Sequence, residues 1–159
     1  MSPRAEELAK RFTAFHNKFT AFVDSCPDKD WTRTCPGENW PVGVVARHVA
    51  AGHYRVFALA KMIVEGRQLP DISREGIDQA NAKHAEKHAG CTKDEVLNLL
   101  RQNGSAISEY ISGLDDADLD RTGHLAAAGG PISTQQVIEN LVIQSAGEHL
   151  ASLKSATGR

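Results

Sequence analysis

Apolar residues recur at steps of three and four positions along four long stretches of the chain. Because an α-helix turns once in 3.6 residues, such steps place side chains on one face of a helix. The most regular series lies in a helix that we predict over residues 3–26, and its members are Leu8, Phe12, Phe15, Phe19 and Phe22. We predict that this series forms a buried aromatic seam in a helical core.

The same periodicity predicts three further long helices, over residues 41–65, 92–114 and 133–156. The starts of the last two carry a recognisable signal. Thr92 and Ser133 each begin a capping-box pattern, in which a side-chain oxygen accepts a hydrogen bond from a backbone amide of the first turn.

Two connections between these helices are long enough to carry structure of their own. A shorter helix is predicted over residues 77–89, between the second and third long helices. The connection over residues 115–131 ends in a Gly-Gly-Pro run, which interrupts regular structure, and we predict no strand in it. The fold expected for residues 1–159 is a single all-α domain, a four-helix bundle with one extra short helix. Its expected core includes Val45, Leu100, Ile107, Leu141 and Leu153.

Composition narrows the class of protein. Charged residues make up 24% and hydrophobic residues 41% of the 159 residues, which is typical of a soluble globular domain. The formal net charge of −2 does not favour nucleic acid as a partner. Charged residues and histidines interrupt the most apolar stretch, residues 42–64, so we expect no membrane span. The first residues lack the apolar core of a signal peptide, which predicts a cytoplasmic protein.

The sequence carries few of the motifs that mark other kinds of chemistry. It has no GxSxG nucleophile motif, no phosphate-binding glycine loop and no dinucleotide fingerprint. Cys26, Cys35 and Cys91 are odd in number and form no CxxC pair, so reduced thiols are expected rather than a disulfide or a four-cysteine zinc site.

Two histidines lie on apolar faces of different predicted helices. His48 is in helical register with Val44, and His149 is in register with Leu141 and Ser145. Both imidazoles should therefore point into the bundle, where facing helices commonly build ligand sites. Histidine is a frequent metal ligand and proton-transfer group. The residues alone leave two interpretations open, a metal or catalytic site and a pair of hydrogen-bonded core histidines.

The remaining histidines are weaker candidates. His84 and His88 are four residues apart, a spacing that can hold one metal ion, but the surrounding AKHAEKHAG segment is polar and favours surface histidines. His53 follows His48 by five residues and should point elsewhere on a regular helix. No function is assigned from the sequence to His16, His53 and His124.

Three stretches of sequence resemble one known family. Trp31, the segment ENWPVGVVARHV and the late segment VIENLVIQSAGEHLASL resemble the DinB-like superfamily. This superfamily includes YfiT-type metal hydrolases and the bacillithiol and mycothiol S-transferases. The resemblance implies a four-helix bundle that holds a divalent metal, zinc or nickel. It also implies that one ligand is a histidine of the second helix and that two ligands lie four residues apart on the last helix.

This resemblance carries over to only part of the ligand set. His48 matches the histidine of the second helix and His149 matches the last ligand, but the remaining position is Ser145, whose hydroxyl is a poor ligand for zinc or nickel. The expected site is therefore a reduced, two-histidine metal site. Asp78 and Asn81 resemble a motif that some members carry on the segment lining the pocket, although a solvated helix face is an alternative explanation.

Two functions from different classes follow from the resemblance. One is a metal-dependent thiol S-transferase or hydrolase that acts on a small-molecule substrate or thiol, with catalytic residues that the sequence does not identify. The other is a metal-free small-molecule-binding or interaction module on the same bundle. We expect a homodimer, with neither nucleic acid nor membrane as a partner.

Overall fold

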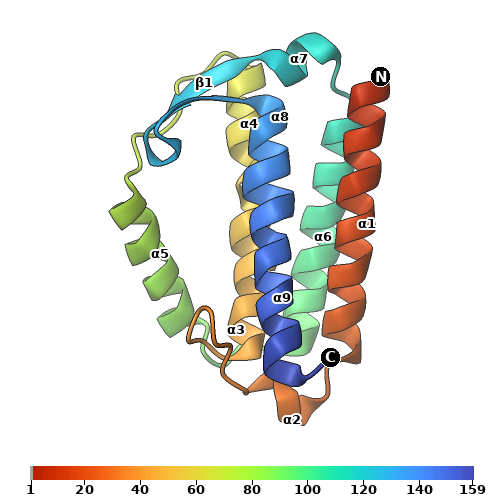
Figure 1. The fold of residues 1–159 in the computed structure, drawn as a ribbon, viewed down its shortest axis with the longest axis vertical. Coiled ribbons are helices and arrows are strands. Elements are labelled where there is room, and N and C mark those ends of the chain that lie inside the picture. Colours follow the sequence, from red (N-terminus) through yellow and green to blue (C-terminus); the bar gives the residue numbers. More distant parts are fainter. Residues whose placement is uncertain (1) are drawn as a thin grey trace.

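Helical columns packed side by side form the body of the computed structural model, which describes residues 2–159 (Figure 1). The first and third columns are single helices, whereas the second and fourth each join several helical segments end to end. The columns are α1 (Pro3–Ser25); α3 (Val42–Arg47), η1 (His48–His53) and α4 (Phe57–Val64); α6 (Lys93–Ser112); and α8 (Thr134–Gln136), η3 (Val137–Gln144) and α9 (Ser145–Thr157). The four-helix bundle predicted from the apolar periodicity is confirmed.

The aromatic seam of α1 lies in the core, where α1 packs along α6. Phe12, Phe19 and Phe22 are buried, and Phe15 is half-buried at the edge of the same cluster. The other residues predicted for the core join them, with Leu141 half-buried and Val45, Leu100, Ile107 and Leu153 fully buried. Burial of such side chains is the main force that holds amphipathic helices together.

The predicted helix starts are also present. The Thr92 side chain accepts a hydrogen bond from the Glu95 amide at the start of α6. Ser133 and Gln136 form a complete capping box before the fourth column. Both contacts satisfy backbone groups that the first turn of a helix would otherwise leave unpaired.

The connection before the fourth column contains a β-hairpin, so the prediction of no strand there is wrong. β1 (Thr122–Leu125) pairs antiparallel with β2 (Gly130–Ser133), after a short helix α7 (Asp116–Asp120). A 3₁₀ turn, η2 (Ala126–Ala128), joins the strands and ends at Gly129, whose φ of 80° favours glycine. The strands are only four residues long, too short to show the alternation by which a strand is recognised in a sequence.

The predicted short helix is α5 (Arg74–Lys87), which stands apart from the columns (Figure 1). None of its residues is buried. Its C-terminal half is tied to α3, because Arg47 donates a hydrogen bond of 2.8 Å to Nε2 of His84. A second short helix, α2 (Asp28–Trp31), lies in the loop before α3. Among residues 2–159, every helix is too short or too polar to cross a lipid bilayer.

Candidate metal centre

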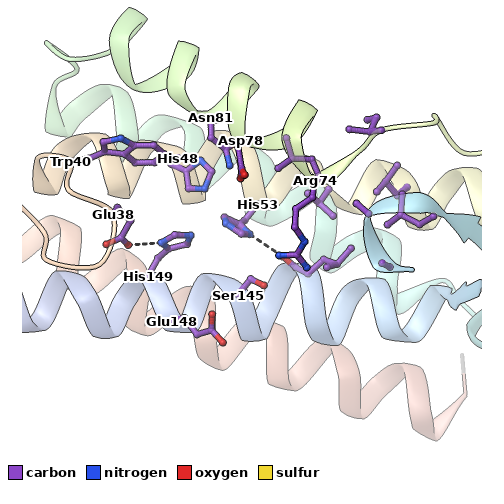
Figure 2. Close-up of a pocket in the computed structure, with 18 residues that line it drawn as sticks. Glu38, Trp40, His48, His53, Arg74, Asp78, Asn81, Ser145, Glu148 and His149 are labelled. Carbon is purple, nitrogen blue, oxygen red and sulfur yellow. Dashed lines mark hydrogen bonds and ion pairs between the residues drawn. The ribbon is translucent and has the colours of Figure 1, made fainter. Parts of the chain in front are cut away.

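Three histidines meet where η1 faces α9. The ring centroids of His48 and His53 are 4.7 Å apart, those of His48 and His149 are 5.0 Å apart, and those of His53 and His149 are 4.8 Å apart. One ligand nitrogen from each ring lies within 4.8 Å of the other two. In Figure 2 the His53 ring points from the helical segment that it shares with His48 toward the helix of His149. The predicted pairing of His48 with His149 is thus present, and a third imidazole joins it.

The local shape of η1 explains why His53 joins the cluster. In a regular α-helix, a residue five positions on is turned away by roughly 140°. Residues 48–53 instead form a π-helix, in which hydrogen bonds join residues five apart, so His53 lies one turn after His48 on the same side. The prediction that His53 points elsewhere on the helix is therefore wrong. The His-x₄-His spacing fits a π turn, but no signal in the sequence distinguishes such a turn from a regular helix.

Side-chain donors stabilise both π-helical segments near the site. Asn103 of α6 donates to the Ala50 carbonyl at 2.8 Å inside η1. In η3, the Leu141 carbonyl accepts from His53 at 3.0 Å, and the Asn140 carbonyl accepts from the Ser145 hydroxyl at 2.9 Å. A widened helix turn leaves carbonyls that need such partners. The Ser145 hydroxyl therefore donates to the backbone of its own helix.

Acceptors behind two of the rings set which nitrogen faces the cluster. A backbone carbonyl can only accept, so the Nδ1 of His53 carries the proton that it donates to Leu141. His149 donates through its own Nδ1 to the Glu38 carboxylate at 2.5 Å. In its neutral form, each of these two rings therefore has its lone pair on Nε2. Partners of this kind, on the far side of each ring, fix the orientation of metal-binding histidines.

Glu38 is a site residue that the sequence analysis missed. Its side chain is only 9% exposed, and its second oxygen accepts from the Ser152 hydroxyl at 2.6 Å. A tight turn presents it: the Asn39 amide donates to the Cys35 carbonyl, and Asn39 adopts a φ of 60°. Glu38 belongs to the ENWP segment, but a contact across 111 residues leaves no local signal in the sequence.

Burial favours the neutral form of two of the clustered imidazoles, those of His48 and His53. Removal from water, followed by charge repulsion from the neighbouring histidines, lowers the pKa of His48 to about 3. Burial also lowers the pKa of His53. The neutral ring is the form that binds a metal. His48 and His53 are therefore in this form at neutral pH.

The packing of His48 depends on a glycine and a tryptophan. Its ring meets Trp40 edge-on, with centroids 5.4 Å apart. On the other side, a Cβ on Gly52 would come within 3.1 Å of the His48 Nδ1. The absence of a side chain at Gly52 therefore leaves room for the ring to reach the cluster.

The other predicted residues lie around a cavity of about 590 Å³ that opens beside the three histidines. Ser145 lines it from α9, and Asp78 and Asn81 line it from α5 (Figure 2). Glu148 lines it as well. One wall of the cavity is α5, and the opposite wall is formed by the second and fourth columns, with the loop before α3 and the β1–η2 segment at its edges.

His84 and His88 remain outside the cluster. His84 is half-buried rather than a surface residue, and its ring centroid lies 5.8 Å from that of His48. Burial, followed by the Arg47 guanidinium, lowers the pKa of His84 to about 4. Since its Nε2 accepts from Arg47, that lone pair is engaged in holding α5.

The fold is shared with solved structures. YfiT from Bacillus subtilis, described as a probable metal-dependent hydrolase with an unusual four-helix bundle topology, superposes with a TM-score of 0.77 at 15% identity. The match covers 99% of this chain and 90% of YfiT. An uncharacterised protein from Clostridium difficile 630 superposes with a TM-score of 0.74 at 14% identity, covering 99% of this chain and 98% of the other.

Sequence comparison leads to the same group. No curated protein matches the sequence significantly. The model of the DinB superfamily matches residues 11–151, which include all three clustered histidines. The chain therefore belongs to the DinB superfamily.

Proposed function

We propose that this protein is a metal-dependent enzyme of the hydrolase or thiol S-transferase type, in which His48, His53 and His149 hold a divalent cation such as zinc or nickel. One observation carries the proposal: three imidazoles converge on the wall of a cavity, and acceptors bind the Nδ1 of two of them, which leaves their Nε2 without a hydrogen-bond partner among the described residues. Three protein ligands with an open position are typical of catalytic rather than structural zinc. The two-histidine site expected from Ser145 is replaced by a three-histidine set.

The residues present fit such a cation. Imidazole nitrogen suits zinc and nickel, and neutral rings bind without first losing a proton. Around tetrahedral zinc, ligand nitrogens lie roughly 3.4 Å apart. The nitrogens here lie within 4.8 Å of one another, so small side-chain rotations would bring them to the spacing that a bound cation needs.

A bound cation would supply a Lewis acid at the cavity wall. The chain's own residues would do the rest. Glu38 holds the orientation of His149, and the Leu141 carbonyl holds that of His53. The Asp78 and Glu148 carboxylates line the same cavity and can accept a proton from a nucleophile there. No cysteine lines the cavity among the described residues, so a thiol nucleophile would have to enter with the substrate.

Metal content of untagged protein tests this proposal. We expect about one zinc or nickel ion per chain by mass spectrometry of the metals. Replacement of His48, His53 or His149 by alanine should lower that content, because a three-ligand site has no spare ligand. His84→Ala and His88→Ala are the matched controls and should retain the metal. Full metal loss in His84→Ala, with retention in His53→Ala, would show that the wrong site has been chosen.

Activity then separates the two reaction types. A hydrolase should cleave p-nitrophenyl acetate with water alone, and a thiol S-transferase should accelerate conjugation of 1-chloro-2,4-dinitrobenzene only when a thiol such as cysteine is added. In either case, loss of activity after chelation and return with zinc are expected. Folded protein that binds no divalent metal would instead support the metal-free binding module.

A further inference from the structure

The cavity beside the three histidines contains an arginine without an ionic partner. Arg74 lies in the first turn of α5 and lines the cavity. In Figure 2 its side chain extends toward the helix of Ser145, on the side of His53 away from His149. No described carboxylate forms an ion pair with Arg74, although five other arginines do so. Arg74 is also the one arginine or lysine among the described residues that line this cavity.

The wall around Arg74 is largely apolar. The residues that provide it are Val56, Leu59, Ile72, Ile77, Leu125 and Leu141. Ile72 and Ile77, which flank Arg74 in the sequence, are the large hydrophobic residues of the described chain that stay exposed, at 39% and 38%. An exposed guanidinium in a cavity with a largely apolar lining matches a ligand with an apolar body and an anionic end, because arginine binds carboxylates in a two-pronged hydrogen-bonded pair.

The other charges of the cavity limit how many negative groups such a ligand can carry. Glu38 is engaged by His149 and Ser152, but Asp78 and Glu148 also line the cavity. Asp78 lies one helical turn after Arg74 and makes no ion pair with it. A second negative charge on the ligand would meet these exposed carboxylates, and like charges disfavour binding.

We propose that Arg74 is the specificity-determining residue of this cavity, and that the substrate is an amphipathic molecule with a single carboxylate. The carboxylate pairs with Arg74, the apolar body covers Ile72 and Ile77, and the other end lies at the three histidines. The assignment of this ligand as a substrate rests on the proposed function; the assignment of the binding site does not, because Arg74 is not a ligand of the cluster.

Calorimetric titration with three eight-carbon probes tests the proposal: octanoate, 1-octanol and octanedioate. Each is titrated into zinc-loaded protein and into chelator-treated protein, since a carboxylate can also bind zinc directly. We expect octanoate to bind both forms more tightly than octanol or octanedioate. Arg74→Gln should weaken octanoate binding about tenfold or more in the chelator-treated form, because a charged hydrogen-bonded pair is lost. Octanol binding should not change.

Arg67→Gln is the matched control, because Arg67 is exposed and lies outside this cavity. It should leave octanoate affinity unchanged. Equal affinity for octanoate and octanol, or octanoate binding insensitive to Arg74→Gln, would overturn the inference. Zinc affinity, measured on the same samples, keeps the two proposals apart. Zinc binding with no effect of Arg74→Gln refutes only this inference, and an effect of Arg74→Gln in protein that binds no zinc refutes only the proposed function.

Discussion

At the scale of single residues, the site depends on a carboxylate far from it in the chain. Glu38 accepts from the Nδ1 of His149 and is itself held by Ser152. A carboxylate behind a metal-binding histidine fixes the ring and raises its basicity. We therefore predict that Glu38→Gln lowers zinc affinity about tenfold, within the range observed for such partners. Competition with a chromophoric zinc chelator at pH 7.5 would measure the change.

Glu148→Gln separates the effect of the hydrogen bond from that of charge. It removes a carboxylate from the same cavity, where burial lowers the pKa of His53, the charge of Glu148 opposes that effect, and Glu148 accepts no hydrogen bond from a ring. Its effect on zinc affinity should be smaller than that of Glu38→Gln. Equal losses in the two variants would mean that only the total charge matters, and Glu38 would lose its assigned role.

At the scale of elements, the sequence predicts the columns but not their local winding. His48 and His149 could be identified because apolar residues at α-helical spacing share their faces. His53 could not, because its place depends on the π turn of η1, in which the Ala50 carbonyl accepts from Asn103 of α6, a contact that is distant in the sequence. The sequence did not predict the hairpin for a similar reason: the burial of Leu125 and Ile132 accompanies strand pairing, which the sequence pattern does not show.

The π turn places the His48 ring close to Gly52, where a side chain on residue 52 would crowd the ring. We predict that Gly52→Ala displaces the His48 ring and weakens zinc binding several-fold, because the new Cβ would lie 3.1 Å from Nδ1. Gly147→Ala, in α9, is the matched control: no atom lies within 4 Å of its Cβ position, and the exchange should leave zinc binding intact. Alanine favours helix by about 0.5–1 kcal/mol at either site. Unchanged zinc affinity in Gly52→Ala would refute this steric account.

At the scale of the whole molecule, the predicted homodimer stays a prediction. Within residues 2–159 the aromatic seam is covered by the chain itself, so it supplies no argument for a partner. Light scattering at two protein concentrations tests it.

The clustered histidines affect the stability of the whole molecule, because the free energy of unfolding depends on the protons that they bind. The pKa of His48 is about 3 in the folded chain, against an ordinary value of 6.5, and burial also lowers the pKa of His53 and His84. The unfolded chain therefore binds more protons than the folded chain below pH 6.5. It follows that the free energy of unfolding of the metal-free protein is fully retained above pH 6.5 and falls as the pH drops toward 3. Urea unfolding at pH 7.5, 6, 5 and 4 measures this slope.

Two comparisons tie that slope to the cluster. The slope of the free energy of unfolding against pH should decrease in His48→Gln by the amount that corresponds to about one bound proton. It should not decrease in His124→Gln, because this position is exposed. Zinc should raise the urea midpoint at pH 7.5, because it binds only the folded chain, and the gain should shrink with falling pH as protons compete for the imidazoles. An identical slope in His48→Gln and in the unchanged protein would show that His48 is not held neutral. The cluster would then lose the property that makes it ready for a metal at neutral pH.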